Sequence, residues 1–335
     1  AELGEMGFLG ATNSADWGGS EIDYETYAQV IEEIAAGDGA VSTLVSVHNA
    51  PTCEILQRFG NPAQKEQWLR PMASGQVVGS FALTESAAGS DAGGIKTRAT
   101  RTNSGYVVNG NKQFISNASV GKTTILFAVT DPDAGKKGIS AFVVANDTPG
   151  FSVARVEHKL GQKASDSCAL SFEDMHIDDS QRIGAEGEGL KIALSTLESG
   201  RIGIAAQSVG MARAALDYAI AYAKERKQFG RPIIEHQAVG FRLVEAKTKL
   251  AAAHELTMKA ARLKDAGRPA LEAAAMAKLF ASEAAESICS AAIQTLGGYG
   301  YLADYPVERI YRDVRVCQIY EGTSDVQKII LQRML

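Results

Sequence analysis

The stretch Phe81-Ala-Leu-Thr-Glu-Ser-Ala-Ala-Gly-Ser-Asp-Ala-Gly-Gly94 begins as a strand-like run and continues as a loop of small residues. Such a loop lets main-chain N–H groups approach a phosphate closely, and the hydroxyls of Thr84 and Ser90 would add donors. The alternative is a flexible surface turn, which the glycine content alone favours. The stretch also marks a change in the sequence, because helical patterns precede it and short strands follow it.

Helical patterns fill residues 1–78. Apolar residues recur at three- and four-residue steps in 24–36 and 43–59, which predicts two helices. Gly60-Asn-Pro62 interrupts the pattern, and a shorter helix is expected at 64–73.

Residues 79–177 contain short β-rich runs separated by turns. The expected strands cover residues 80–83, 106–108, 112–115, 123–130, 140–144 and 168–172. Asn109-Gly110 lies between two of these runs and predicts a hairpin, because both residues tolerate the positive φ of a type I′ turn. Strands at this spacing indicate a small barrel or sandwich.

Long helical patterns return from Gly189 onward. Core-facing stripes are expected at Leu190, Leu194 and Leu197, at Val209, Ala212, Leu216, Ala219 and Ala223, and at Val239, Leu243, Ala246 and Leu250. Gly267-Arg-Pro269 breaks the run before an alanine-rich helix at 270–296. Long amphipathic helices with brief breaks predict an antiparallel bundle.

The predicted fold is therefore α+β and multidomain. It has a helical N-terminal domain at 1–78, a barrel-like β domain at 79–182 and a helical bundle at 183–335. A chain of 335 residues exceeds the roughly 250 to 300 residues at which a single core stops growing, which also favours several domains. The sequence has no repeated βαβ pattern, which argues against a doubly wound Rossmann sheet.

Composition limits the function classes. The 45% hydrophobic and 22% charged residues are typical of a soluble globular protein, and a net charge of -5 provides no field that would hold nucleic acid. The four cysteines, Cys53, Cys168, Cys289 and Cys317, are scattered, which predicts buried thiols. The histidines lack metal-ligand spacing, and no apolar run approaches the roughly 20 residues that span a bilayer. We therefore expect no metal site, no nucleic-acid partner and no membrane insertion.

Two segments combine glycine or basic residues with helix ends. Gln294-Thr-Leu-Gly-Gly-Tyr-Gly-Tyr-Leu302 ends a helix in glycines that suit a left-handed cap. A helix stop explains one glycine, whereas the cluster of Gly297, Gly298 and Gly300 indicates a group close to the backbone. Glu225-Arg-Lys-Gln-Phe-Gly-Arg231 is a basic turn, which compensation of a helix dipole alone would explain.

Ile319-Tyr-Glu-Gly-Thr-Ser-Asp325 places a carboxylate in an otherwise apolar stretch. Such surroundings raise the pKa of a carboxyl group, which can then serve as a base for a weakly acidic C–H. The alternative is helix capping, with Ser324 or Asp325 opening a helix at 326–335. The spacing favours neither interpretation.

Taken together, these segments resemble the acyl-CoA dehydrogenase family over nearly the whole chain. Residues 82–91 and 294–313 match the two signature stretches of the family, in the right order. The resemblance implies a helical N-terminal domain, a β domain and a C-terminal four-helix bundle. Relatives usually carry additional helix before the position of Ala1, so the resemblance implies a truncated or incompletely represented N-terminus.

The resemblance implies FAD as the cofactor, contacted by the β domain, the bundle and a neighbouring subunit. Phe81, Leu83, Thr84, Gly89 and Ser90 would contact flavin and pyrophosphate, and Ile115 and Ser116 would flank the flavin ring. Arg226, Phe229, Gln237, Gln294, Gly297 and Gly298 would reach the FAD of a partner subunit. Thr323 and Asp325 would hold adenosine-side groups, although many relatives have Gln or Glu in place of Asp325.

The implied reaction removes a proton from the carbon α to a thioester and a hydride from the β carbon, giving a trans-2-enoyl-CoA. Glu321 would take the proton, while a main-chain N–H and a flavin ribityl hydroxyl polarise the thioester. Some relatives carry the base at the position of Gly200, which cannot serve here. Residues expected to line the acyl-CoA site are Ser90, Arg201, Tyr320 and Arg333.

Several runs resemble short and branched-chain members of the family. Ser46-Val-His-Asn49 and Met276-Ala-Lys-Leu-Phe-Ala281 are similar to isobutyryl-CoA dehydrogenases, and residues 198–205 are similar to butyryl-CoA dehydrogenases. The resemblance implies an electron-transfer flavoprotein as acceptor, a homotetramer built as a dimer of dimers, and a role in fatty acid metabolism or branched-chain amino acid catabolism. The compartment would be the cytoplasm of a bacterium or the mitochondrial matrix of a eukaryote. The alternatives are an acyl-CoA oxidase and a catalytically silent relative that binds flavin or acyl-CoA.

Overall fold

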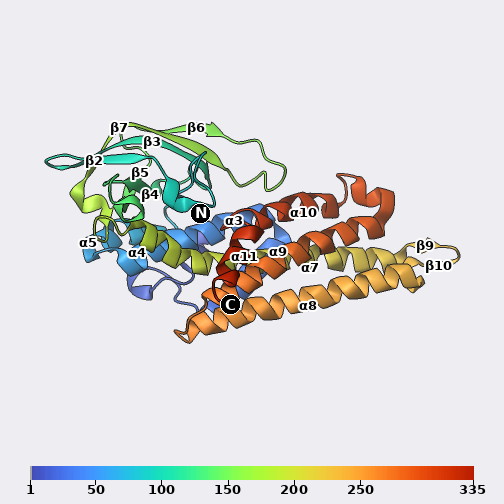
Figure 1. The fold of residues 1–335 in the computed structure, drawn as a ribbon. Helices are drawn as coiled ribbons and strands as arrows, with labels where there is room; N and C mark the ends of the chain where they lie inside the picture. The colour runs from blue at the N-terminus through green and yellow to red at the C-terminus, as the bar shows by residue number, and fades with distance from the viewer. Residues whose placement is uncertain (1) are drawn as a thin grey trace. The chain divides into compact units, whose positions relative to one another are not determined.

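The computed structural model describes residues 2–335, and its elements follow the expected order of helices, strands and helices (Figure 1). The chain divides into two compact units. The first contains the residues up to 23, residues 44–158 and residues 165–200. The second contains residues 24–43, 159–164 and 201–335, so the division falls inside one long helix, α7.

Short helices dominate the N-terminal part of the first unit. They are α1 (Glu2–Glu5), η1 (Phe8–Gly10), η2 (Ala15–Trp17), the end of α3 (Gly39–Val47), η3 (His48–Cys53), α4 (Glu54–Phe59), α5 (Pro62–Gln64), η4 (Lys65–Leu69) and α6 (Arg70–Ala73). The single helix expected at 43–59 is interrupted at η3, where Ala50 is extended with φ −134° and ψ 117° before Pro51. The residue before a proline is pushed out of the helical region, which explains the break.

The strands of the first unit form one sheet. They are β1 (Gly79–Ala82), β2 (Arg98–Arg101), β3 (Gly105–Ile115), β4 (Thr123–Val129), β5 (Ile139–Ala145), β6 (Phe151–Val156), β7 (Cys168–Asp178) and β8 (Arg182–Ile183), with short turns η5 (Ala92–Gly94), η6 (Gly135–Gly138) and η7 (Asp179–Gln181). The order is β6-β7-β3-β2-β4-β5-β8, and β1 pairs in parallel with β4. The two end strands, β6 and β8, do not pair, so the sheet is open.

Strand β4 is buried on both faces, which explains its unbroken apolar sequence. Ile125 and Phe127 pack into a cluster that includes helical residues such as Ile55 and Leu56. Leu126 and Ala128, which point to the opposite face, pack in a second cluster formed largely by β3, β5 and β7. Side chains alternate between the faces of a strand, so β4 contributes to two cores at once.

The hairpin expected at Asn109-Gly110 is wrong. β3 runs continuously from Gly105 to Ile115 along β7, and the pairing register shifts between Val108 and Gly110. Gly110 has φ 146°, and an added Cβ would lie 2.7 Å from Cα of Thr97, so glycine here permits a bulge and a close approach. The Asn109 side chain bonds to Asp174 instead of closing a turn.

A buried ion pair closes the loop that follows β1. Lys112 on β3 is fully buried, and its Nζ donates to Oε1 of Glu85 at 2.8 Å and to the Leu83 carbonyl at 3.0 Å. Glu85 also accepts from the main-chain N–H groups of Lys96 and Thr97 at 2.7 and 3.0 Å. Burial alone would raise the pKa of Glu85, but Lys112 and these donors outweigh it and hold the pKa below its usual range. The ends of the small-residue loop are thereby tied to the sheet.

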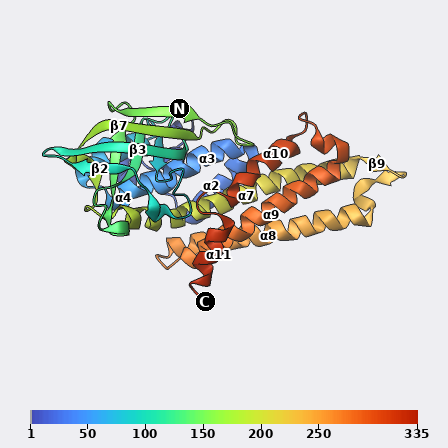
Figure 2. The same ribbon diagram turned by 45° about the horizontal axis from the view of Figure 1, so that its top comes forward.

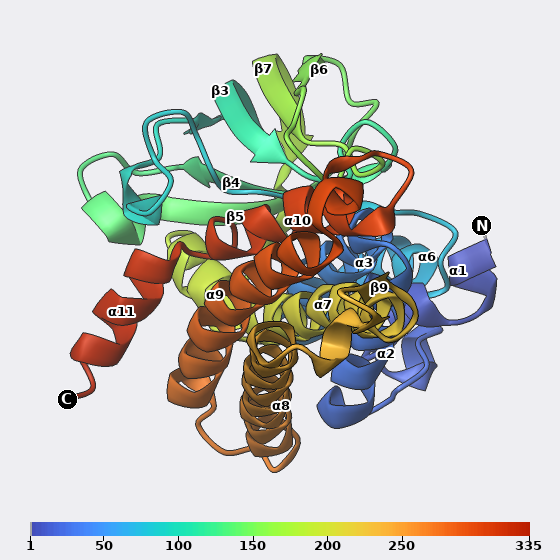
Figure 3. The same ribbon diagram turned by 90° about the vertical axis from the view of Figure 1, so that its right-hand side faces the viewer.

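Long helices make up most of the second unit. Its elements are α2 (Tyr24–Gly37), the start of α3, the part of α7 (Gly189–Glu225) from Arg201 onward, β9 (Lys227–Gln228), β10 (Arg231–Pro232), η8 (Ile233–Glu235), α8 (Gln237–Asp265), α9 (Leu271–Leu296), η9 (Gly297–Tyr301), α10 (Pro306–Val314), η10 (Arg315–Gln318) and α11 (Ser324–Gln332). Figures 2 and 3 show α8 and α9 side by side and α10 next to α9.

Four of these helices share one hydrophobic core. Leu216 of α7, Leu243 of α8, Ile288 of α9 and Val307 of α10 belong to the same buried cluster, which confirms the predicted bundle. The expected stripe at the start of α7 is wrong at Leu194, which is 49% exposed because the buried face there follows Ile192, Ala193 and Thr196.

All four cysteines are free and buried, as expected. Within residues 2–335, no helix combines the length and the hydrophobicity that crossing a bilayer requires.

The Glu85–Lys112 pair generates a stability prediction. Glu85→Gln leaves a buried ammonium without its counter-charge, so we expect the variant to lose about 3 kcal/mol of unfolding free energy in a urea titration. Glu66→Gln, which removes one partner of an exposed ion pair with Arg70, is the control and is expected to leave the midpoint nearly unchanged. Equal midpoints for the two variants would contradict the structural role of Glu85.

Candidate active site

Glu321 lies at a sharp turn between η10 and α11. It has φ 54°, and Gly322 follows with φ 87°, where an added Cβ would lie 2.8 Å from Nε2 of Gln327. The helix after the turn is capped by Thr323, whose hydroxyl accepts from the Val326 N–H at 3.2 Å. Neither Ser324 nor Asp325 acts as the N-cap, and Glu321 does not cap the helix either. Helix capping therefore does not account for the Glu321 carboxylate.

The Glu321 carboxyl group is withdrawn from solvent. Its Oε2 is buried, and no described residue offers it a hydrogen bond. Burial raises the pKa of Glu321 from its ordinary value of 4.5 to about 7, although the charges of Arg201 and Lys278 oppose this rise. A carboxylate with a pKa near neutrality is a stronger base than an exposed one and still ionises at physiological pH.

Tyr320 is fixed by a buried polar network. Its hydroxyl donates to Oε1 of Gln207 and lies 3.5 Å from both Oγ1 of Thr43 and Nε2 of Gln162. Gln207 in turn donates to Oγ1 of Thr43 at 2.6 Å. Burial holds the pKa of Tyr320 well above its ordinary value, so the phenol stays neutral. The hydroxyl is therefore used inside the protein, and the network anchors the residue that precedes Glu321.

The predicted flavin contacts of the first unit lie on two neighbouring segments. The main-chain N–H of Gln113 donates to the Thr84 carbonyl at 2.9 Å, which brings the segment containing Phe81, Leu83 and Thr84 next to the end of β3. Ile115 and Ser116 follow at that end. The side chains of Leu83 and Ile115 are buried, at 4% and 2% exposure, so these two residues offer a ligand only their main chain.

Gly89 and Ser90 are exposed in the loop that Glu85 closes. A Cβ added to Gly89 would meet nothing within 4 Å. Phe114, next to Ile115, has φ 61° and is 63% exposed. An exposed aromatic ring in a strained conformation at this position is consistent with a ligand-binding surface.

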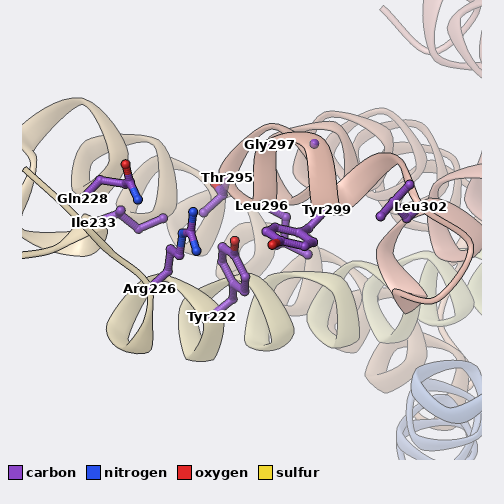
Figure 4. Close-up of a pocket in the computed structure, with 10 residues that line it drawn as sticks. Tyr222, Arg226, Gln228, Ile233, Thr295, Leu296, Gly297, Tyr299 and Leu302 are labelled. Atoms are coloured by element: carbon purple, nitrogen blue, oxygen red, sulfur yellow. The ribbon is translucent and has the colours of Figure 1, made fainter.

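Some of the basic and glycine residues predicted to contact cofactor lie together in the bundle. A cavity of about 500 Å³ is lined by Tyr222, Arg226, Gln228, Ile233, Thr295, Leu296, Gly297, Gly298, Tyr299 and Leu302. Figure 4 shows the Arg226 and Tyr222 side chains rising from the end of α7 toward Leu296 and Tyr299. The Arg226 guanidinium lies 5.7 Å from the centre of the Tyr299 ring.

The other predicted contacts of the second unit lie outside this cavity. Phe229, in the β9–β10 hairpin, is 93% exposed, and Gln237 and Gln294 are exposed on α8 and α9. On α11, the Asp325 side chain is 88% exposed and lies 4.0 Å from Lys328, and Arg333 is exposed at the C-cap. The Thr323 hydroxyl is already used by the cap. The structure thus groups Arg226 with Gly297 and Gly298, but it does not bring the other predicted cofactor contacts of the second unit into the same cavity.

The sequence did not predict two residues that lie next to the Glu321 turn. Lys278 is fully buried on α9, and Gln327 is fully buried on α11. The spacing could have indicated that Lys278 is buried, because it falls on the same helix face as Ala274 and Ala281, where an apolar residue is expected. A buried lysine requires a partner, which points to a specific site.

Comparisons with known proteins cover nearly the whole chain. The family models for acyl-CoA dehydrogenase match as N-terminal domain over residues 1–76, middle domain over 80–175 and C-terminal domain over 187–335. The chain is 42% identical to a short-chain specific acyl-CoA dehydrogenase of Clostridium acetobutylicum over 98% of this chain and 87% of the relative.

Solved structures give the same result. The butyryl-CoA dehydrogenase of Megasphaera elsdenii superposes with a TM-score of 0.98 at 41% identity, covering 99% of this chain and 88% of that one. A chain from a structure described as the electron transferring flavoprotein of Acidaminococcus fermentans also has a TM-score of 0.98, at 42% identity and the same coverage. The three-domain fold expected from the sequence is confirmed, and the chain belongs to the acyl-CoA dehydrogenase family of FAD-dependent oxidoreductases.

Proposed function

We propose that this chain dehydrogenates a short straight or branched acyl-CoA to the trans-2-enoyl-CoA, with Glu321 removing the α proton. The observation that carries the proposal is the buried Oε2 of Glu321, which has no hydrogen-bonding partner among the described residues. A carboxylate oxygen left unsatisfied in a buried site is costly unless a ligand uses it. The raised pKa supports the role of this oxygen as a proton acceptor.

The choice of a short acyl chain is supported by the relatives. The Clostridium acetobutylicum protein is described as short-chain specific, and the Megasphaera elsdenii protein is a butyryl-CoA dehydrogenase. Gly200 occupies the position at which some relatives carry the base, and glycine has no side chain to accept a proton. Glu321 is therefore the proposed base.

The residues present fit FAD. Gly89, Gly297 and Gly298 border open space, because an added Cβ would meet nothing within 4 Å at any of them. Arg226 supplies a cation to the cavity beside Gly297, where it suits a phosphate. Bound FAD supplies a hydride acceptor at N5 of its flavin ring. The proposed contacts from this chain are Phe81, Leu83, Thr84, Gly89, Ser90, Ile115, Ser116, Arg226, Phe229, Gln237, Gln294, Gly297, Gly298, Thr323 and Asp325.

Proton removal requires the thioester oxygen to be polarised, because a carbon acid α to a thioester is weakly acidic. The main-chain N–H of Glu321 suits this purpose, since it donates no hydrogen bond within residues 2–335. Ser90, Arg201, Tyr320 and Arg333 remain the proposed lining of the acyl-CoA site. Tyr320 would contribute its ring, because its hydroxyl is held by Gln207.

We further propose an electron-transfer flavoprotein as the acceptor and a homotetramer as the assembly. The similarity to a chain of the Acidaminococcus fermentans electron-transferring flavoprotein structure supports this choice of acceptor.

The domains are proposed to divide at residues 78/79 and 182/183, and the compartment is proposed to be the bacterial cytoplasm or the mitochondrial matrix. An acyl-CoA oxidase is the alternative. Oxygen consumption equal to substrate turnover would favour the oxidase.

Replacement of the proposed base tests the assignment. Glu321→Gln keeps the size of the side chain but cannot accept a proton, so kcat is expected to fall by about 10²- to 10⁴-fold with bound FAD retained. An assay with butyryl-CoA or isobutyryl-CoA and an artificial acceptor measures the loss, and the flavin absorbance reports cofactor content. Glu272→Gln, at an exposed position of α9, is the control for removing one carboxylate. A wild-type rate in Glu321→Gln would refute the assignment.

The ionisation of Glu321 sets a pH dependence. Only the carboxylate accepts a proton, and the pKa of the group is about 7, so kcat/KM should rise with pH below 7 and level off above it. A profile at constant ionic strength with saturating artificial acceptor measures this behaviour. A profile that is flat through pH 7 would contradict the raised pKa.

A further inference from the structure

Two buried side chains hold the turn that carries Glu321. Nζ of Lys278 donates to the Gly322 carbonyl at 2.6 Å. Nε2 of Gln327 donates to the same carbonyl at 2.8 Å and to the Glu321 carbonyl at 3.2 Å. Both side chains are fully buried, and they come from different helices, α9 and α11, which pack against each other. The main chain on the C-terminal side of the carboxylate is therefore fixed from two directions.

The turn has a conformation that needs such support. Glu321 has φ 54° and carries a side chain, although residues other than glycine populate this region sparsely. Tyr320, on the other side, is held by Gln207 and its network. Loss of the bonds to Gly322 would leave the turn anchored on one side only.

Lys278 binds a neutral carbonyl and not the carboxylate. Among the described residues no salt bridge joins Lys278 to Glu321, so its charge acts on the carboxylate through space. Burial lowers the pKa of Lys278 to about 8, while Cys317, Glu321 and Glu283 favour its charged form and Arg201 disfavours it. On the Glu321 side, burial favours the protonated acid, and the charges that oppose burial belong to Arg201 and Lys278.

We propose that Lys278 is a positioning residue for the reaction: its ammonium group holds the Glu321–Gly322 turn through the Gly322 carbonyl and stabilises the negative charge of Glu321. The reaction assigned to Glu321 rests on the proposed function. Lys278 touches neither the substrate nor the reacting atoms in this scheme. Gln327 shares the hold on the turn but carries no charge, so the two residues separate the mechanical effect from the electrostatic one.

The test follows the protonation of Glu321 directly, in the FAD-bound enzyme. Infrared titration reports the carboxylic acid band that disappears in Glu321→Gln, and its midpoint in the wild type is expected at about pH 7. In Lys278→Met the midpoint should rise by about one pH unit, because a charge that favours the carboxylate is lost. In Gln327→Leu the midpoint should stay in place, while kcat falls because the turn is loosened.

Two further variants separate the contributions. Lys278→Gln keeps a donor for the Gly322 carbonyl without the charge, so it should raise the midpoint as Lys278→Met does but retain more of kcat at high pH. Lys278→Gln also provides the charge-removal test if Lys278→Met does not fold. Lys112→Met removes the other fully buried lysine, in the first unit, and should lower the thermal midpoint without moving the Glu321 titration.

The rates complete the test. For Lys278→Met we expect a fall of about tenfold in kcat/KM at pH 7, an unchanged KM for the acyl-CoA and partial recovery at higher pH. If the wild type is active and the Glu321 midpoint in both Lys278→Met and Lys278→Gln equals that of the wild type, the role of Lys278 is overturned. If the wild type oxidises no short acyl-CoA but the two variants still shift the Glu321 midpoint, the proposed function is overturned instead. The effect of Lys278 on Glu321 then remains in place.

Discussion

Burial of Oε2 of Glu321, with no hydrogen-bonding partner among residues 2–335, is the constraint on which the rest of the site depends. A group in this position would be protonated at neutral pH if burial acted alone. Arg201 on α7 and Lys278 on α9 oppose burial, and the resulting pKa of about 7 keeps a substantial fraction of the carboxylate available. Charges from two helices thus act on one ionisable group. Both helices belong to the core that α7, α8, α9 and α10 share.

The two fully buried lysines show how the choice of partner sets the behaviour of a carboxylate. Lys112 bonds directly to Glu85, and main-chain N–H groups complete the set, so the pKa of Glu85 falls and the residue serves as a permanent anchor. Lys278 bonds to a carbonyl instead and acts on Glu321 only through its charge, so burial outweighs it and the pKa of Glu321 rises. One arrangement closes a loop, and the other leaves a base free to take up a proton.

Periodicity and turn residues were sufficient to predict the order of helical, β-rich and helical regions and the break at Gly267-Arg-Pro269. They did not predict strands β2 and β6. Local rules failed where tertiary contacts decided the outcome. Asn109-Gly110 reads as a turn, yet pairing along β7 keeps β3 continuous. Leu194 fits a helical stripe but faces outward. Lys278 was missed because periodicity cannot show which distant carbonyl a buried ammonium reaches, and the capping alternative at Ser324 or Asp325 was removed only by the observed Thr323 bond.

Hydrogen exchange at the α carbon of the substrate measures proton removal separately from oxidation. The FAD-bound enzyme would be incubated without oxygen or electron acceptor in D2O with a short acyl-CoA thioester, and α-deuterium would be followed by mass spectrometry. If Glu321 is the proton acceptor, the wild type incorporates deuterium at the α carbon, and Glu321→Gln, with its FAD retained, does not. Equal incorporation by the two proteins would show that another group takes the proton.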